Sequence, residues 1–143
     1  MKKNLQGQIR EIIYHPHPIL RRQAETVNLE KIKTQKFQQF LKDMEVTMLA
    51  KDGAGLAAPQ IGVSEQVIII TGRNGNNNII MINPQITRHS WGKTISEEGC
   101  LSVVDEQGRI IYGKVERYKR ITCQYINEEG KKKKIKAEEP LAR

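Results

Sequence analysis

The chain has 143 residues, 38% of them hydrophobic, which is enough for one folded domain and excludes a disordered protein. Its longest apolar runs, at 67–70 and 79–82, are far shorter than the roughly 20 residues of a membrane-spanning helix, and the polar residues 4–11 do not resemble a secretion signal. We therefore expect a single cytoplasmic domain over residues 1–143 with no membrane contact, whose net charge of +8 favours polyanionic neighbours.

The clearest predicted element is a helix over residues 35–50. Thr34 can cap its first turn, and Gly53 is expected to end it in the left-handed conformation. Its apolar face consists of residues spaced three or four apart: Phe37, Phe40, Leu41, Met44 and Met48. We expect this face to pack in the core.

The other predicted elements are strands. Four short segments are rich in β-branched residues or alternate apolar with polar residues: 67–71, 79–83, 121–125 and 131–137. A turn at 72–78, which contains Asn-Gly, joins the first two strands, and Pro84 is expected to end the second. The predicted fold class is α+β, with mostly antiparallel sheets around one helix.

A glycine-rich segment, residues 53–62, follows the predicted helix. Its small residues allow a ligand or a second backbone to approach closely. Gln60 is a polar residue in this otherwise apolar stretch, and its amide needs a hydrogen-bond partner if it is buried. Two interpretations remain open: a tight corner in which Gln60 bonds the backbone, or a ligand site.

Cys100 lies in a second unusual segment, residues 97–102, after two glutamates and a glycine. It can be a metal ligand, a nucleophile or a small buried residue. The neighbouring carboxylates oppose formation of a thiolate, but a bound metal ion reverses that effect. Cys123 lies on the apolar face of a predicted strand and is expected in the core, and two cysteines do not make a disulfide framework.

Taken together, residues 53–60 and 98–102 resemble the first two of the three motifs of peptide deformylases. Residues 16–21 are also similar to the start of that family, so the resemblance runs from Ile9 to Arg143. It implies a hydrolase of protein biosynthesis that removes the formyl group from N-formylmethionyl peptides or nascent chains. It also implies a divalent metal as cofactor, commonly iron, with zinc or nickel as substitutes.

The resemblance assigns roles to individual residues. Cys100 matches the cysteine that ligates the metal. Gln60 matches the glutamine whose amide stabilises the oxyanion, with help from the backbone N–H of Leu101. The residues that correspond to the substrate-binding positions are Gly55, Leu56 and, through a looser correspondence, Arg109.

The third motif of the family, His-Glu-x-x-His on a late helix, does not occur in these 143 residues. The histidines are expected at the surface: His15, His17 and His89. The resemblance places Arg143 about where the third-motif helix begins, so we expect a truncated domain without the C-terminal metal-binding helix. A catalytic metal needs three protein ligands and Cys100 supplies one. We therefore expect no stably bound metal and no hydrolytic activity from this chain alone.

Three further expectations follow from the resemblance and the charge. One alternative is an active deformylase completed by residues outside this sequence. Another is a non-catalytic binder of nascent chains or ribosomal RNA, which the basic stretches 114–120 and 131–136 motivate. The alternative for 131–136 is a solvated hairpin edge, where lysines discourage strand pairing with other molecules, and the aromatic content of 5% argues against base stacking. Finally, the sheet face that the third-motif helix would cover is expected to be buried in a homo-oligomer.

Overall fold

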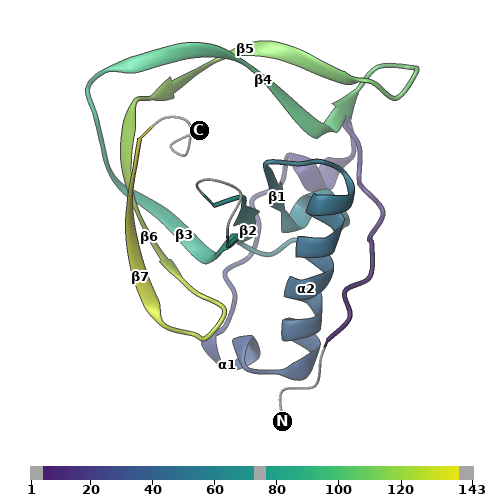
Figure 1. The fold of residues 1–143 in the computed structure, drawn as a ribbon, viewed down its shortest axis with the longest axis vertical. Helices are drawn as coiled ribbons and strands as arrows, with labels where there is room; N and C mark the ends of the chain where they lie inside the picture. Colours follow the sequence, from purple (N-terminus) through teal and green to yellow (C-terminus); the bar gives the residue numbers. More distant parts are fainter. Residues whose placement is uncertain (1–4, 73–76, 139–143) are drawn as a thin grey trace.

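The structure is a computed structural model that describes residues 5–72 and 77–138 (Figure 1). Its helical elements are η1 (Pro18–Leu20), α1 (Leu29–Ile32), α2 (Gln35–Ala50) and η2 (Ala58–Ile61). Its strands are β1 (Gly55–Ala57), β2 (Val67–Ile70), β3 (Ile79–His89), β4 (Lys93–Val104), β5 (Ile110–Tyr118), β6 (Arg120–Ile126) and β7 (Lys132–Glu138). The predicted α+β class with antiparallel pairing is confirmed. Within the two described ranges, none of the helices has the length and apolarity to cross a membrane.

Helix α2 has the predicted bounds. It begins after Thr34, whose Oγ1 accepts the N–H of Phe37 at 3.2 Å. Its buried apolar side chains are Phe37, Leu41, Met44 and Met48. The predicted end is wrong in one detail, because Asp52, with φ 52°, takes the left-handed conformation that was expected of Gly53. A small residue is needed at Gly53 for another reason: a Cβ there would lie 2.9 Å from Leu101 Cδ1.

The main sheet has five strands in the order β1-β2-β3-β6-β7. The prediction that Pro84 ends the second hairpin strand is wrong, because β3 continues for five residues to His89. The register of β3 against β6 shifts between Ile82 and Gln85, so Pro84 lies at an irregularity where its missing N–H removes no ladder bond. The predicted turn at 72–78 lies partly outside the described residues, which resume at Asn77.

Strands β4 and β5 form a separate two-stranded ribbon that was not among the predicted strands. Figure 1 shows β3 continuing into β4 and β5 continuing into β6, so that the ribbon arches over β1 and one end of α2. Large apolar side chains are exposed along the ribbon: Ile95, Ile111 and Tyr112. Half-buried strands are identified in a sequence by alternating apolar and polar residues. The ribbon lacks this alternation because some of its apolar residues face solvent, so its strands were not predicted.

The core lies between α2, the N-terminal segment and β1 to β3. Its fully buried side chains include Ile32, Met44, Met48, Ile69 and Ile82. The N-terminal segment is attached to α2 by Asp43, which is only 1% exposed. The Asp43 carboxylate accepts the N–H of Gln8 at 2.8 Å, the Nε2 of Gln39 at 2.9 Å and the Nε of Arg10 at 2.8 Å. Burial alone would raise the pKa of Asp43, but these hydrogen bonds and the Arg10 charge lower it overall.

Candidate active site

Gln60 lies in η2, the short helical turn that follows β1. Its Oε1 accepts the backbone N–H of Ala57 at 2.9 Å, and its main-chain carbonyl accepts the N–H of Ile13 at 2.7 Å. Because an N–H donor occupies Oε1, the amide has a defined orientation, with Nε2 directed away from the turn. The side-chain oxygen of Gln60 therefore makes the backbone hydrogen bond expected of a tight corner, whereas the side-chain nitrogen bonds outside the turn.

The Gln60 Nε2 reaches across to β4. It lies 3.1 Å from Ser102 Oγ and 3.5 Å from Cys100 Sγ. An amide nitrogen carries two hydrogens, so it can donate to both acceptors. The two sequence segments singled out above, 40 residues apart, thus meet at one point. Because sulfur is a weak acceptor, the Gln60 N–H directed at Cys100 readily donates instead to a stronger acceptor that enters the site.

The part of β4 that carries Cys100 lies outside the regular ladder. Pairing with β5 is regular up to Gly99 opposite Tyr112 and resumes only at Val104 opposite Ile110. Such an interruption re-aims side chains and backbone groups. Cys100 is exposed, whereas Ser102 is 2% exposed and its carbonyl accepts the N–H of His15 at 2.8 Å. The interrupted stretch is therefore held on its inner side and presents Cys100 outward.

Gly55 and Leu56 lie on β1, which is an edge strand of the five-stranded sheet. They are paired with Ile70 and Ile69 of β2 on one side. The Leu56 side chain is 2% exposed and belongs to the core, so any contact of Leu56 with a ligand is made by its backbone. An edge strand can accept another extended chain by main-chain hydrogen bonds.

Arg109 lies in the turn between β4 and β5. Its Nε donates to Asp105 Oδ2 at 2.8 Å, and one of its terminal nitrogens donates to Gln107 Oε1 at 3.3 Å. The backbone N–H of Arg109, more than any other group, lowers the pKa of Asp105. The contacts of this side chain are therefore within its own turn, whereas the structure brings Gln60, Cys100 and Ser102 together.

Two features of the site were not identified from the sequence. Ser102 was included in the cysteine motif without a role, although it is an acceptor for Gln60. Glu98, two residues before Cys100, pairs with Arg117 of β5 through two contacts at 3.0 and 3.3 Å. No local pattern connects Glu98 to a residue 19 positions later. The β4–β5 register places Gly113 opposite Glu98 and Thr94 opposite Arg117, so only the three-dimensional structure identifies this ion pair.

The donor set around Cys100 does not by itself fit a catalytic metal. In residues 5–72 and 77–138 there is no group of three His, Cys, Asp or Glu side chains that could hold a metal ion. The exposure expected of the histidines is confirmed; His17 Nδ1 caps η1, and His89 stacks on Tyr118. A catalytic zinc site uses three protein ligands and keeps one open position. Cys100 therefore suits one ligand position, and the described residues do not supply the others.

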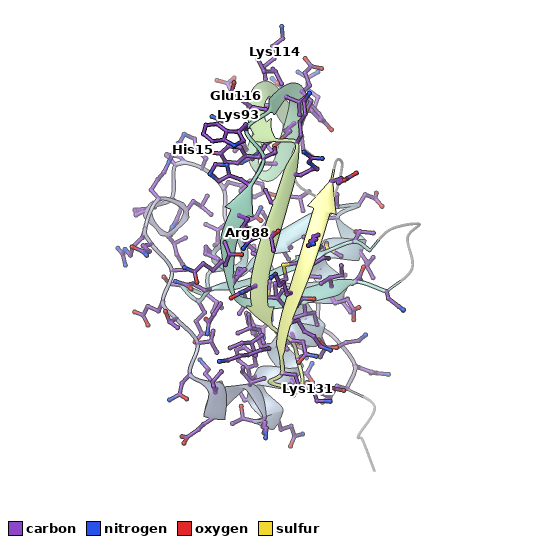
Figure 2. All side chains as sticks on the ribbon, turned by 90° about the vertical axis from the view of Figure 1, so that its left-hand side faces the viewer. His15, Arg88, Lys93, Lys114, Glu116 and Lys131 are labelled. Carbon is purple, nitrogen blue, oxygen red and sulfur yellow. The ribbon has the colours of Figure 1, made fainter. Side chains whose placement is uncertain are left out.

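An apolar groove lies between the five-stranded sheet and the β4–β5 ribbon. Its volume is about 460 Å³, and its apolar lining includes Ile68, Met81, Ile86, Ile121, Cys123 and Ile135. Cys123 is buried, as predicted, and burial raises the pKa of its thiol. Lys93 and Glu116, which form an ion pair at 3.2 Å, contribute polar atoms to the same groove, and Figure 2 shows them on the ribbon.

Comparison with known proteins gives concordant matches. A family model described as polypeptide deformylase matches residues 9–143. A peptide deformylase of Halothermothrix orenii is 40% identical over 126 residues, which are 88% of this chain and 76% of the relative. Peptide deformylase 1 of Bacillus cereus is 42% identical over 134 residues, which are 93% of this chain and 80% of the relative.

Solved structures agree with these matches. A class I type b peptide deformylase from Acinetobacter baumannii superposes with a TM-score of 0.86 at 31% identity, covering 94% of this chain and 87% of that chain. A peptide deformylase from Thermotoga maritima gives a TM-score of 0.84 at 33% identity, covering 95% of this chain and 86% of that chain. The resemblance identified from the two motifs is confirmed.

Proposed function

Since the chain belongs to the peptide deformylase family, we propose that it provides the oxyanion-stabilising and peptide-binding part of a site that removes the formyl group from N-formylmethionyl peptides. The observation that carries this proposal is the meeting of Gln60 and Cys100 at 3.5 Å, with the amide oxygen of Gln60 already bonded to Ala57. The amide is thus oriented before any substrate enters.

The oriented amide suits the charge that develops in amide hydrolysis. When the formyl carbonyl becomes tetrahedral, its oxygen gains negative charge and requires hydrogen-bond donors. The Gln60 hydrogen that faces the Cys100 sulfur is available to that oxygen, because the oxygen is the stronger acceptor. The backbone N–H of Leu101 is the second donor in this proposal. One preorganised donor of this kind contributes about 2.7–4 kcal/mol to stabilisation of the transition state.

The peptide part of the substrate is proposed to bind beside β1. Gly55 and Leu56 have main-chain groups at the sheet edge, where an extended peptide can add as a further strand. The side chain of Leu56 stays in the core, so these contacts are largely independent of the peptide sequence. Arg109 remains a weaker proposal for the substrate backbone, since its side chain is bonded to Asp105.

Hydrolysis requires groups beyond the described site. Cys100 is proposed as one ligand of a divalent metal, with iron, zinc or nickel as candidates. The family's two histidines and its glutamate have no counterpart in the 143-residue sequence. We therefore propose that these 143 residues alone do not turn over substrate, and that activity requires the imidazoles and the base from another segment.

The experiment measures deformylation of a formylmethionyl tripeptide under four conditions. The chain is assayed alone, with added iron or zinc, with a synthetic His-Glu-x-x-His helix, and with metal and helix together. We expect turnover only in the last condition, and Gln60→Ala should then reduce it by about 100-fold or more. Turnover with stoichiometric metal and no helix would contradict the proposed incompetence. Equal turnover by Gln60→Ala would contradict the role of Gln60.

Three proposals concern the setting of this function. We propose that the protein acts in the cytoplasm, where nascent chains carry the formyl group. Association with ribosomes is a further proposal, supported by the net charge of +8. Self-association over the apolar groove is the third, supported by the groove's apolar lining, in which Ile86 is exposed.

A further inference from the structure

The corner between β3 and β4 carries an unusual aromatic residue. Trp91, the only tryptophan of the chain, has a relative exposure of 103%. It lies in the turn after His89 and before Lys93. An aromatic pair lies beside this turn, where the His89 ring stacks on Tyr118 with a centroid distance of 3.9 Å. An indole with this exposure contributes nothing to the core, and both of its faces are accessible to a ligand.

The turn is held by the neighbouring corner between β5 and β6. Ser90 N–H donates to the Arg120 carbonyl at 2.9 Å, and the Arg120 N–H donates back to Ser90 Oγ at 3.2 Å. The N–H of Lys119 donates to the Gly92 carbonyl at 3.1 Å. These hydrogen bonds with Lys119 and Arg120 fix the backbone of the turn from which the Trp91 side chain extends.

Lys119 and Arg120 line the same hollow as Trp91, and Arg88 and Lys136 line the hollow beside it. The basic-aromatic corner, as we name it, consists of Trp91 and the exposed cations Arg88, Lys93, Lys119, Arg120 and Lys136. Two shallow hollows of about 300 and 530 Å³ adjoin each other there, since both are lined by Ser90, Arg120 and Glu138. Figure 2 looks onto this side of the molecule, with Arg88 and Lys93 labelled and Lys131 at the opposite end.

Acidic residues only partly balance these cations. Glu116 pairs with Lys93 at 3.2 Å, and Glu138 lies opposite Arg120 in the β6–β7 register. Among the residues of this corner that the structure describes, five cations therefore face two carboxylates, so the excess charge of these described residues is positive. The corner combines an open aromatic face with spaced positive charges, which is the arrangement that single-stranded nucleic acids require for base stacking and phosphate contacts.

We propose that the basic-aromatic corner binds single-stranded RNA, with one base stacked on Trp91 and the adjacent phosphates on Arg88, Lys119 and Arg120. In the proposed function the substrates are nascent chains, and RNA is the polyanion found where such chains are made. The low aromatic content argued against base stacking, but stacking one base needs only one open aromatic ring, and Trp91 provides it. This binding surface is separate from the Gln60–Cys100 site and does not depend on hydrolysis.

The test uses the tryptophan fluorescence of the 143-residue chain, excited at a wavelength that its four tyrosines do not absorb, so that the signal reports on Trp91 alone. Titration with a short oligouridine should quench this fluorescence, because a stacked base contacts the indole directly. Inorganic polyphosphate carries the charge without the bases, so it should compete for the cations without comparable quenching. Raising KCl from about 50 to 200 mM should weaken oligouridine binding steeply.

Variants separate stacking from charge, with affinity measured by anisotropy of labelled oligouridine. Trp91→Ala should weaken binding by about fivefold or more, the loss expected for one base–aromatic stack, whereas Trp91→Phe should retain part of it. The double variant Arg88→Gln/Arg120→Gln should lower the slope of log affinity against log salt by about 1.4, or about 0.7 for each phosphate contact of a single strand. Lys36→Gln, an exposed lysine on α2, is the matched control and should change neither value.

Three results would overturn the proposal. The first is unchanged oligouridine affinity in Trp91→Ala. The second is equal quenching by polyphosphate, which would show that charge alone accounts for the signal. The third is a blue shift of Trp91 emission with anionic phosphatidylserine vesicles and no response to oligouridine, which would assign the corner to a membrane surface.

Discussion

Replacing Ser102 by alanine tests whether β4 orients the Gln60 amide. The substitution removes the Oγ that lies 3.1 Å from Gln60 Nε2. The backbone of Ser102 keeps its own anchor, because its carbonyl accepts the N–H of His15 at 2.8 Å. Ser102 is 2% exposed, and alanine is smaller by one oxygen, so the strand is expected to keep its position.

The magnitude follows from what remains after the substitution. Gln60 Oε1 stays bonded to Ala57 N–H at 2.9 Å, and Nε2 keeps only its weak contact with Cys100 Sγ at 3.5 Å. One intramolecular hydrogen bond contributes about 0.5–1.5 kcal/mol net. We therefore expect the free energy of unfolding to fall by about 1 kcal/mol and the nitrogen end of Gln60 to lose its fixed direction toward Cys100.

A double-mutant cycle measures this coupling. Urea unfolding of Ser102→Ala, Gln60→Ala and the double variant should give an interaction energy of about 0.5–1.5 kcal/mol. Nuclear magnetic resonance supplies the second readout: the two Gln60 side-chain N–H signals should exchange slowly in the unmodified chain and faster in Ser102→Ala. Additive effects in the cycle, together with unchanged exchange, would refute the idea that Ser102 positions Gln60.

Three other predictions concern stability and assembly. Because the pKa of Asp43 is lowered in the folded chain, Asp43 contributes stability above its unfolded pKa of about 3.9, and this contribution is lost as the pH falls through its folded pKa. Asp43→Asn should therefore destabilise the chain at pH 7. In thermal melts below about pH 4, the difference in melting temperature between the variant and the unmodified chain should shrink. Gly99→Ala places a Cβ 2.7 Å from Ile110 Cγ2 and should reduce the free energy of unfolding by about 1–3 kcal/mol. The control is Gly113→Ala on β5, where a Cβ would have no atom within 4 Å, and this variant should melt like the unmodified chain. Equal melting temperatures of the two variants would contradict the close contact between Gly99 and Ile110. Sedimentation velocity should show a concentration-dependent dimer that Ile86→Asp weakens, and a monomer at all concentrations would disprove self-association over the groove.

The sequence predicts those parts of the fold in which local chemistry is sufficient. Helix α2 has the predicted bounds because Thr34 caps it and its apolar residues share one face. The bounds of β3 could not be predicted, because Pro84 ends a strand unless an irregularity accommodates it. That irregularity depends on pairing with β6, more than 35 residues away in the chain. The β4–β5 ribbon was missed because its exposed apolar residues do not alternate with polar ones.

In the candidate site, too, the contacts between segments that are distant in the chain could not be predicted from local chemistry. Gln60 and Cys100 were connected only through the resemblance to a family, since nothing in the spacing of the two segments brings them together. The contact at 3.5 Å depends on how β4 crosses η2, which is a property of the tertiary structure. Arg109 was matched to a substrate-binding position, yet its side chain is bonded within its own turn. Trp91 was not predicted as a site residue, because its exposure to solvent cannot be recognised from the sequence.

The most direct test of the account is a nuclear magnetic resonance titration of the isotopically labelled chain with a formylmethionyl tripeptide and with the same peptide lacking the formyl group. The account predicts that only the formyl peptide shifts the Gln60 side-chain amide and the Leu101 backbone N–H, while both peptides shift the backbone signals of Gly55 and Leu56. Binding of the formyl peptide with no change at Gln60 and Leu101 would contradict the claim that these donors face the carbonyl to be hydrolysed.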